Sequence, residues 1–405
     1  MKNMKAPVGL IALFAGLSAV AVPMISSDPG VTLTQRGRRL AEVTYTLSGG
    51  PAIVTVDFCT NGVSIGACNV TSLAGDVNKL VSDGAHKLTW NVFADWPDHT
   101  ITDGSLTAVV TAWSPSCPPP YMALDLSGAK GTFYYPCAEA VPGGVTNDLY
   151  KTDKLLMRKI EACNRTFRMG SSPNEAGYST TQRARLVTLT KDFWIGVYPV
   201  TQRQQFLAIG NLAQCSFTDK EDSNLRPANG CSNKNVRNNT SVSGNPGNGS
   251  ILTALRAVTG EPLDVPTEAQ WEFACRAGTG TYLYSGANLE DKNAATSERL
   301  GKLAWYAGNA GGETHPVGLK EPNAFGLYDM IGNVSELVLD QYNDIATNDQ
   351  VTDPLPTNGN GQIFRGGSYA SQLLQCSPAH RWTGASISWS SVSPERGFRC
   401  ALTIQ

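Results

Sequence analysis

Near the C-terminus, the stretch RGGSYASQLLQC (residues 365–376) ends in a cysteine with three open roles. Its thiolate could hold a redox metal ion, its sulfur could form a disulfide, or the thiol could simply be buried as a small apolar group. A soft metal ion would need a second soft ligand nearby. The role of Cys376 therefore bears directly on whether the protein is an enzyme.

Other catalytic patterns are weak in this sequence. The sequence contains only four histidines, and they are widely dispersed: His86, His99, His315 and His380. This dispersion favours local structural roles over a metal cluster. No HExxH helix is present. The glycine-rich segment GNPGNGS lacks the Lys-Ser/Thr pair of a P-loop and is interpreted as an ordinary loop.

Two regions with different patterns must position these residues. In residues 22–114, short runs rich in Val, Thr, Ile and aromatics are separated by Gly, Asn and Asp, and the runs are AEVTYTLS, PAIVTVDF, HKLTWNVF and SLTAVVTAW. This pattern predicts a small all-β sandwich of the immunoglobulin or fibronectin kind. It would serve as a structural module, or as a binding or spacer module.

Residues 115–153 are rich in Pro and Gly and predict a linker or an ordered extension. Residues 154–405 form the second domain, which contains few helical patterns. In TEAQWEFACRAG, Thr267 and Gln270 predict a capping box, and Trp271 and Cys275 fall on one helix face. A second helix, SILTALRAVTG, should end at Gly260. A domain so dominated by loops needs disulfides or metal ions to fix it.

Composition and charge narrow the class of protein. Because 41% of the residues are hydrophobic and only 16% are charged, the chain is not intrinsically disordered. The net charge of −2 and the absence of Lys/Arg clusters argue against a nucleic-acid partner.

The first 21 residues have the features of a cleaved signal peptide. Lys2 and Lys5 precede an apolar run, and Ala19-Val20-Ala21 is a small-x-small cleavage site. The run is too short to span a bilayer, and no later segment is long enough, so the mature protein should have no membrane span. We therefore expect a secreted or periplasmic protein. In such a compartment the ten cysteines favour disulfides, and proximity suggests the pairs Cys59–Cys68, Cys117–Cys137 and Cys215–Cys231.

Five stretches of the second domain resemble the formylglycine-generating enzyme, or sulfatase-modifying factor, family, and they occur in the family's order. They are FRMGSSPNE, RLVTLTKDFWIGVYPVTQRQ, VPTEAQWEFACRAGTG, PVGLKEPNAFGLYDMIGNVSELVLD, and RGGSY with a closing RGFRC. The resemblance implies an α+β fold with little regular secondary structure, similar to C-type lectins. It does not extend to the N-terminal 150 residues, and a fold does not transfer an activity.

The resemblance also implies structural calcium. In YDMIGNVSE, the side chains of Asp329 and Glu336 and the carbonyls of Gly332 and Val334 match the family's ligands, and oxygen donors of these types suit calcium. Two solvated acids beside a turn are the alternative. A second calcium site would involve Asn293 and the carbonyl of Ala294.

Oxidases of this family hold copper(I) between two cysteine thiolates. Matched to that spacing, the two positions are Ser371 and Cys376, and a serine hydroxyl is a poor ligand for copper(I). Ser368, a residue of the family's substrate groove, is retained. The resemblance to non-oxidase relatives implies a Cys275–Cys376 disulfide, with a free buried Cys376 as the alternative. Copper is therefore not expected, and a bond between Cys163 and Cys400 is a weaker expectation.

Together these features predict an exported pseudoenzyme that binds a peptide, glycan or protein partner in the groove of its lectin-like domain. The residues expected to line that groove are Trp305, Tyr306, Arg365, Ser368, Tyr369, His380 and Arg381. Aromatic and cationic side chains suit such ligands. A formylglycine-generating oxidase acting on a sulfatase cysteine and a structural surface protein are the alternatives.

Overall fold

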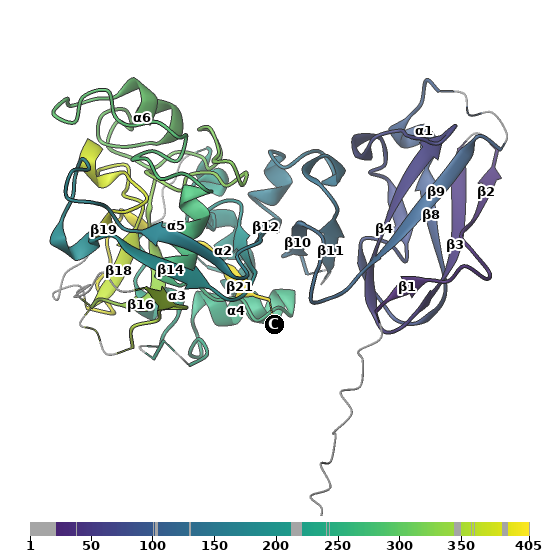
Figure 1. Ribbon diagram of the computed structural model, residues 1–405, viewed down its shortest axis with the longest axis horizontal. Helices are drawn as coiled ribbons and strands as arrows, with labels where there is room; N and C mark the ends of the chain where they lie inside the picture. Colours follow the sequence, from purple (N-terminus) through teal and green to yellow (C-terminus); the bar gives the residue numbers. More distant parts are fainter. Residues whose placement is uncertain are drawn as a thin grey trace, which may run out of the picture.

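The computed structural model describes residues 22–404 except 38, 100, 102–103, 129–130, 212–220, 240, 243, 344–349, 358, 360 and 383–387. The predicted signal peptide and Cys215 lie outside the described residues. The strands form two sheets near the N-terminus and three further sheets after residue 120 (Figure 1). No described helix is longer than 9 residues, too short to cross a bilayer.

The N-terminal module consists of two sheets. The first has the order β1-β3-β8-β6 with β2 also on β3, and its strands are β1 (Met24–Ile25), β2 (Thr32–Arg36), β3 (Leu40–Ser48), β6 (Leu73–Gly75) and β8 (Gly84–Asn91). The second joins β5 (Val63–Ser64), β4 (Ala52–Thr60), β7 (Lys79–Val81) and β9 (Leu106–Trp113). A short helix, α1 (Val92–Asp95), follows β8. The four predicted strands correspond to β3, β4, β8 and β9.

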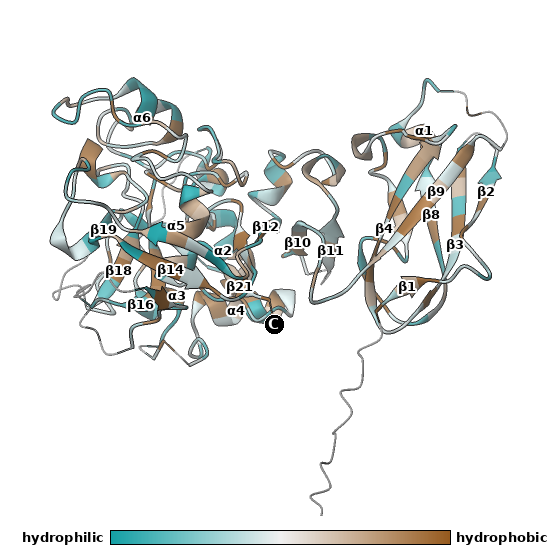
Figure 2. Cartoon of the chain, viewed as in Figure 1, coloured by the Kyte–Doolittle hydropathy of each residue, from teal (hydrophilic) through white to brown (hydrophobic). Residues whose placement is uncertain are grey.

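Alternation of apolar and polar residues builds this module. Along β3 every second side chain is buried, and these meet apolar residues of β4 and β8 in one hydrophobic cluster. Phe58 and Trp90 stack there with ring centroids 4.5 Å apart. Figure 2 shows the apolar colouring along β3, β4 and β8.

Residues 115–153 are more than a linker. They contain β10 (Tyr121–Asp125) and β11 (Thr132–Tyr135), which extend a sheet of the second domain in the order β11-β10-β12-β15-β21. The other strands of that sheet are β12 (Lys154–Ile160), β15 (Phe193–Gly196) and β21 (Ala401–Thr403). The backbone N–H of Tyr134 also donates to the carbonyl of Asn78, at 2.7 Å, in the N-terminal module. Of the two alternatives that the composition of this segment leaves open, the structure matches the ordered extension and not the linker.

The second domain combines this sheet with two smaller ones and short helices, which fits the predicted α+β class. One sheet contains β13 (Arg165–Met169), β14 (Arg185–Leu189) and β17 (Val351–Thr352). The other contains β19 (Arg381–Trp382), β18 (Gln362–Arg365), β16 (Ser335–Gln341) and β20 (Arg396–Gly397). The helices are α2 (Gln202–Ile209), α3 (Asn233–Val236), α4 (Ile251–Thr259), α5 (Glu268–Arg276) and α6 (Glu298–Leu303). Single 3-10 turns occupy Ala67–Asn69, Ala138–Ala140, Asp148–Tyr150, Thr180–Gln182, Ser223–Leu225 and Leu373–Gln375.

Both helices predicted from the sequence are confirmed. Thr267 and Gln270 form the expected capping box at the start of α5, and α4 ends at Gly260 in a left-handed conformation. Trp271 and Cys275 are fully buried in the same hydrophobic cluster, as their spacing on one face required. α5 thereby becomes the central helix against which β13, β16 and β18 pack.

Candidate functional site: an aromatic and charged cluster around Ser368

Two arginines expected in the groove lie inside the protein. Arg365 of β18 is 0% exposed and pairs with both Glu268 and Glu272 of α5. Arg381 of β19 is also buried, and its guanidinium donates to both carboxylate oxygens of Glu268, at 2.7 and 3.0 Å. Their charges are neutralised by these pairs, so neither is free to bind a ligand. The groove assignment of both residues is corrected accordingly.

Tyr306 and His380 also contribute to the interior more than to a surface. The Tyr306 side chain is buried, and its hydroxyl oxygen accepts from the backbone N–H of Ser297 at 2.9 Å. His380 is half-buried, and its carbonyl accepts from Arg365. Burial, and then the nearby charge of Arg365, lowers the pKa of His380 to about 4, so the imidazole is neutral at pH 7.

Ser368 and Ser371 form a small hydrogen-bonded cluster with Glu395. The hydroxyl of Ser368 donates to Glu395 Oε2 at 2.8 Å and lies 3.1 Å from the hydroxyl of Ser371. Ser371 Oγ also accepts from the backbone N–H of Ser368 at 2.9 Å. Burial and the charge of Glu395 raise the pKa of Tyr369, which is half-buried beside them. These contacts give both serine hydroxyls structural partners.

The Trp305 loop adjoins this cluster through the backbone. Asn333 N donates to Trp305 O at 2.7 Å, and Tyr369 N donates to Asn333 O at 2.9 Å. The indole of Trp305 stacks on His315 with centroids 3.8 Å apart, and Lys320 Nζ lies 3.7 Å from the indole centroid. The two serines are buried, Ser368 being 0% and Ser371 2% exposed, whereas the side chains around them are half-buried. We call the whole group the Ser368 surface: Trp305, His315, Lys320, Ser368, Tyr369, Ser371 and Glu395.

Sequence reasoning placed Trp305, Ser368 and Tyr369 in the groove, Ser371 at a former copper position and His315 in a local structural role, but missed Lys320 and Glu395. Glu395 directly precedes RGFRC and is 27 residues from Ser368 in the sequence. No local sequence pattern relates two residues that far apart. The pairing of Lys320 with Trp305 likewise depends on loops that only the fold brings together.

The donors at the two copper positions do not fit copper(I). Cys376 is fully buried, and burial raises the pKa of its thiol to about 12, which keeps it protonated rather than as the thiolate a metal needs. The Ser371 hydroxyl is engaged with the main chain and side chain of Ser368.

The expected Cys275–Cys376 disulfide is not formed, because both residues carry free thiols. The thiol of Cys275 faces the carbonyl of Met330 at 3.9 Å, whereas Cys376 packs so closely on Gly367 that a Cβ there would lie 3.0 Å from its sulfur. The structure thus matches the alternative of a buried thiol. The other expected pairs are likewise unformed where both partners are described, since the free thiols include Cys59, Cys68, Cys117, Cys137, Cys163 and Cys400.

The expected calcium ligands divide into two environments. Both carboxylate oxygens of Glu336 accept from Arg399 at 2.6 Å, and one also accepts from the indole of Trp271 at 2.6 Å. Arg399 thus supplies the positive charge that calcium would supply, and Glu336 does not fit as a ligand.

Asp329 fits a cation better than Glu336 does. It is 1% exposed and accepts from the backbone N–H of Gly318 at 2.7 Å, and no cationic side chain in the described ranges donates to it. Burial raises its pKa to about 6. Asn293 and Ala294, expected at a second site, belong to a loop that Asp291 organises by accepting from Asn293 N at 2.8 Å. No group of three or more His, Cys, Asp or Glu residues suited to a metal occurs in the part of the chain that the structure describes.

Comparison with known proteins places this arrangement in a family. Residues 160–404 match the profile of the "Sulfatase-modifying factor enzyme 1-like domain". Formylglycine-generating enzyme of Mus musculus is 30% identical over 145 residues, which are 34% of this chain and 38% of that protein. Serine/threonine-protein kinase pkn1 of Chlamydia pneumoniae is 30% identical over 35% of this chain and 21% of its own. The chain therefore spans less than two thirds of these relatives.

Among solved structures, Treponema denticola variable protein 1 is 25% identical with a TM-score of 0.49, over 62% of this chain and 95% of its own. PvdO from Pseudomonas aeruginosa is 24% identical with a TM-score of 0.46, over 62% of this chain and 94% of its own. The names of the relatives include an enzyme that generates formylglycine and a kinase, so the shared domain does not fix one activity. Because the family profile covers more than half of its residues, this chain belongs to the sulfatase-modifying factor family.

Proposed function

We propose that this protein is an exported, non-catalytic member of its family that binds a peptide, glycan or protein partner on the Ser368 surface. The observation that carries the proposal is the state of the two copper positions. Ser371 offers a hydrogen-bonded hydroxyl, and Cys376 offers a protonated thiol in the apolar core. Export is inferred from the N-terminal sequence alone.

The chemistry of the surface suits a polar ligand with flat faces. Tyr369 offers a half-buried aromatic ring, and Glu395 and Lys320 offer charges of opposite sign. His315 and Lys320 cover the two faces of the Trp305 indole, so Trp305 shapes the surface by holding these two side chains. Aromatic faces next to hydrogen-bonding groups are typical of glycan and peptide recognition. We keep the lectin-like description of the second domain, and the immunoglobulin or fibronectin description of the N-terminal module, as parts of this proposal.

A structural calcium ion is a further part of the proposal, held by the Asp329 carboxylate with the carbonyls of Gly332 and Val334. In this arrangement Glu336 stays in its ion pair with Arg399 and does not bind the ion. The support is the buried Asp329 carboxylate, which lacks a cationic hydrogen-bond partner among the described side chains. Such an ion would supply the missing charge and tie two loops together.

An activity assay tests the non-catalytic claim. Purified protein is incubated with copper, oxygen and a peptide containing Cys-x-Pro-x-Arg, and mass spectrometry follows conversion of its cysteine to formylglycine. We expect no conversion by the wild-type protein. Formylglycine formation by wild type, absent from a Cys376→Ala variant, would refute the proposal in favour of an oxidase. The Ser371→Cys variant is the matched control, because it restores the second sulfur at the family's position.

A further inference from the structure

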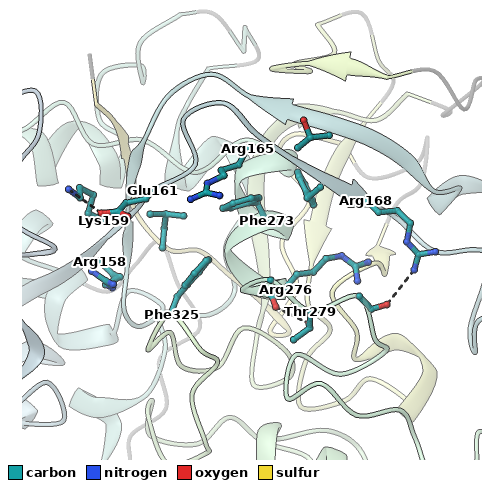
Figure 3. Close-up of a pocket in the computed structure, with 14 residues that line it drawn as sticks. Arg158, Lys159, Glu161, Arg165, Arg168, Phe273, Arg276, Thr279 and Phe325 are labelled. Carbon is teal, nitrogen blue, oxygen red and sulfur yellow. Dashed lines mark hydrogen bonds and ion pairs between the residues drawn. The ribbon is translucent and has the colours of Figure 1, made fainter.

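A cavity lies apart from the Ser368 surface, beside β13 and the C-terminal end of α5 (Figure 3). Its volume is about 580 Å³, and none of the Ser368 surface residues lines it. Cavities that hold small organic ligands have volumes of roughly 300–1,000 Å³, so this one is large enough for such a molecule.

Three phenylalanines form the apolar wall of the cavity. Phe273 meets Phe167 edge to face with centroids 5.2 Å apart, and its centroid lies 6.2 Å from that of Phe325. All three rings pack on the core, yet each stays only half-buried. Exposed ring faces and edges in this arrangement can pair with another aromatic ring.

Basic residues dominate the rest of the lining. They are Arg158, Lys159, Arg165, Arg168 and Arg276, against the single acid Glu161. Three of the five are already paired: Lys159 with Glu161, Arg168 with Glu175 and Arg276 with Glu272. For Arg158 and Arg165, no acidic partner occurs among the residues that the structure describes. Two positive charges therefore remain uncompensated at this cavity.

The two uncompensated arginines are held differently. Arg158 is fixed, because it donates to the carbonyl of Pro120 at 3.1 Å and lies over the ring of Tyr121. Its Nε is buried and has no hydrogen-bond acceptor. Arg165 is exposed and can reorient towards a ligand. In Figure 3, Arg158 lies on the left, Arg165 in the upper middle beside Phe273, and the paired Arg168 on the right.

We propose that this cavity binds an aromatic carboxylate. The ring would lie against Phe273 and Phe325, and the carboxylate would accept a forked pair of hydrogen bonds from Arg165. The ligand could be a free aromatic acid or the C-terminal aromatic residue of a peptide, which present the same chemistry. The inference does not depend on the function proposed for the Ser368 surface.

Calorimetric titration of the full mature chain tests the proposal, with N-acetyl-phenylalanine as the probe and its uncharged amide for comparison. We expect the acid to bind at least about tenfold more tightly than the amide, because charge-assisted hydrogen bonds to arginine would be lost. Arg165→Gln should weaken binding of the acid by about the same factor without changing the melting temperature. Phe325→Ala should weaken the acid and the amide equally, because it removes only the contact with the ring.

Arg39→Gln is the matched control, since Arg39 is an exposed arginine of the N-terminal module that lies over the ring of Phe93. It should leave the affinity unchanged. Equal affinities for acid and amide, no binding of the acid up to its solubility limit, or equal losses from Arg39→Gln and Arg165→Gln would each overturn the proposal. A peptide ending in phenylalanine separates the sources: tighter binding than the capped amino acid indicates a peptide terminus, and weaker binding indicates a free acid.

Discussion

The two parts of the molecule bury different kinds of side chain. In the N-terminal module the largest fully buried residues are Trp90 and Phe58, which stack on one another. In the second domain they include Arg237, Arg365 and Arg399. Apolar contacts suffice where strands alternate regularly, whereas the loop-rich domain is fixed by paired charges that accept only one geometry. Buried pairs of this kind add little net stability, but breaking one is costly.

Removing the charge of Arg399 should have the largest effect. Arg399→Ala leaves Glu336 buried without its counter-charge, so we expect the free energy of unfolding to fall by about 3–5 kcal/mol. Urea unfolding measures the loss. Hydrogen exchange should locate it in residues 154–404 and leave β3 and β8 protected.

The double variant Glu336→Gln with Arg399→Met sharpens this result. It removes both charges, and the amide introduced at position 336 can still accept from the Trp271 indole, so the loss should be far smaller than in the single variant. A double variant as unstable as the single one would show that the arginine acts through packing and not through charge.

A second prediction concerns the unpaired charge at Asp329, which should make stability depend on pH. Its pKa is raised from 3.8 to about 6, so the folded protein holds a proton that the unfolded chain has released. Without calcium, stability therefore falls as the pH rises from about 4 to about 6, by about 3 kcal/mol, and then levels off. Asp340, whose pKa burial raises to about 7, adds a slope of the same sign. Asp329→Asn, followed by thermal melts across pH, should therefore reduce the slope and leave the share of Asp340.

Calcium supplies the control for that measurement. If the ion binds Asp329, added calcium raises the melting temperature of wild type at pH 7, and the rise is absent from Asp329→Asn. Identical melts with calcium and with chelator would remove calcium from the proposal while leaving the pH effect intact.

The smallest expected effect is at the start of α5. Thr267→Ala removes the hydroxyl that accepts from Gln270 N at 3.1 Å and should cost about 1 kcal/mol. The loss stays small because Glu268 and Glu272 also anchor the helix through their arginine partners. Thr267→Ser, which keeps the hydroxyl, is the control in urea unfolding. A loss as large as that from Arg399→Ala would mean that the cap, not the ion pairs, holds α5.

Patterns that are local in sequence were predictable, and long-range pairings were not. The alternation along β3 and the capping box of α5 gave correct elements, and the ordered motifs gave the family. The partners of Arg365 and Arg381 lie 93 and 113 residues away, so their burial could not be read from residue types that suit a groove. For the same reason the hydrogen bond between Ser368 and Glu395, 27 residues apart, could not be predicted. Arg165 was missed because an isolated exposed arginine carries no local signal.

The sheet continues from β12 to β10 and from β10 to β11, which has a practical consequence for the limits of the domain. The match to the family begins at residue 160, yet three strands of the five-stranded sheet precede that point or end on it. A fragment cut there would leave one long side of β15 without its neighbour β12, an unpaired edge that invites aggregation. The segment that matches the family is thus shorter than the unit that should fold. A fragment that starts near residue 116 would keep all five strands of the sheet.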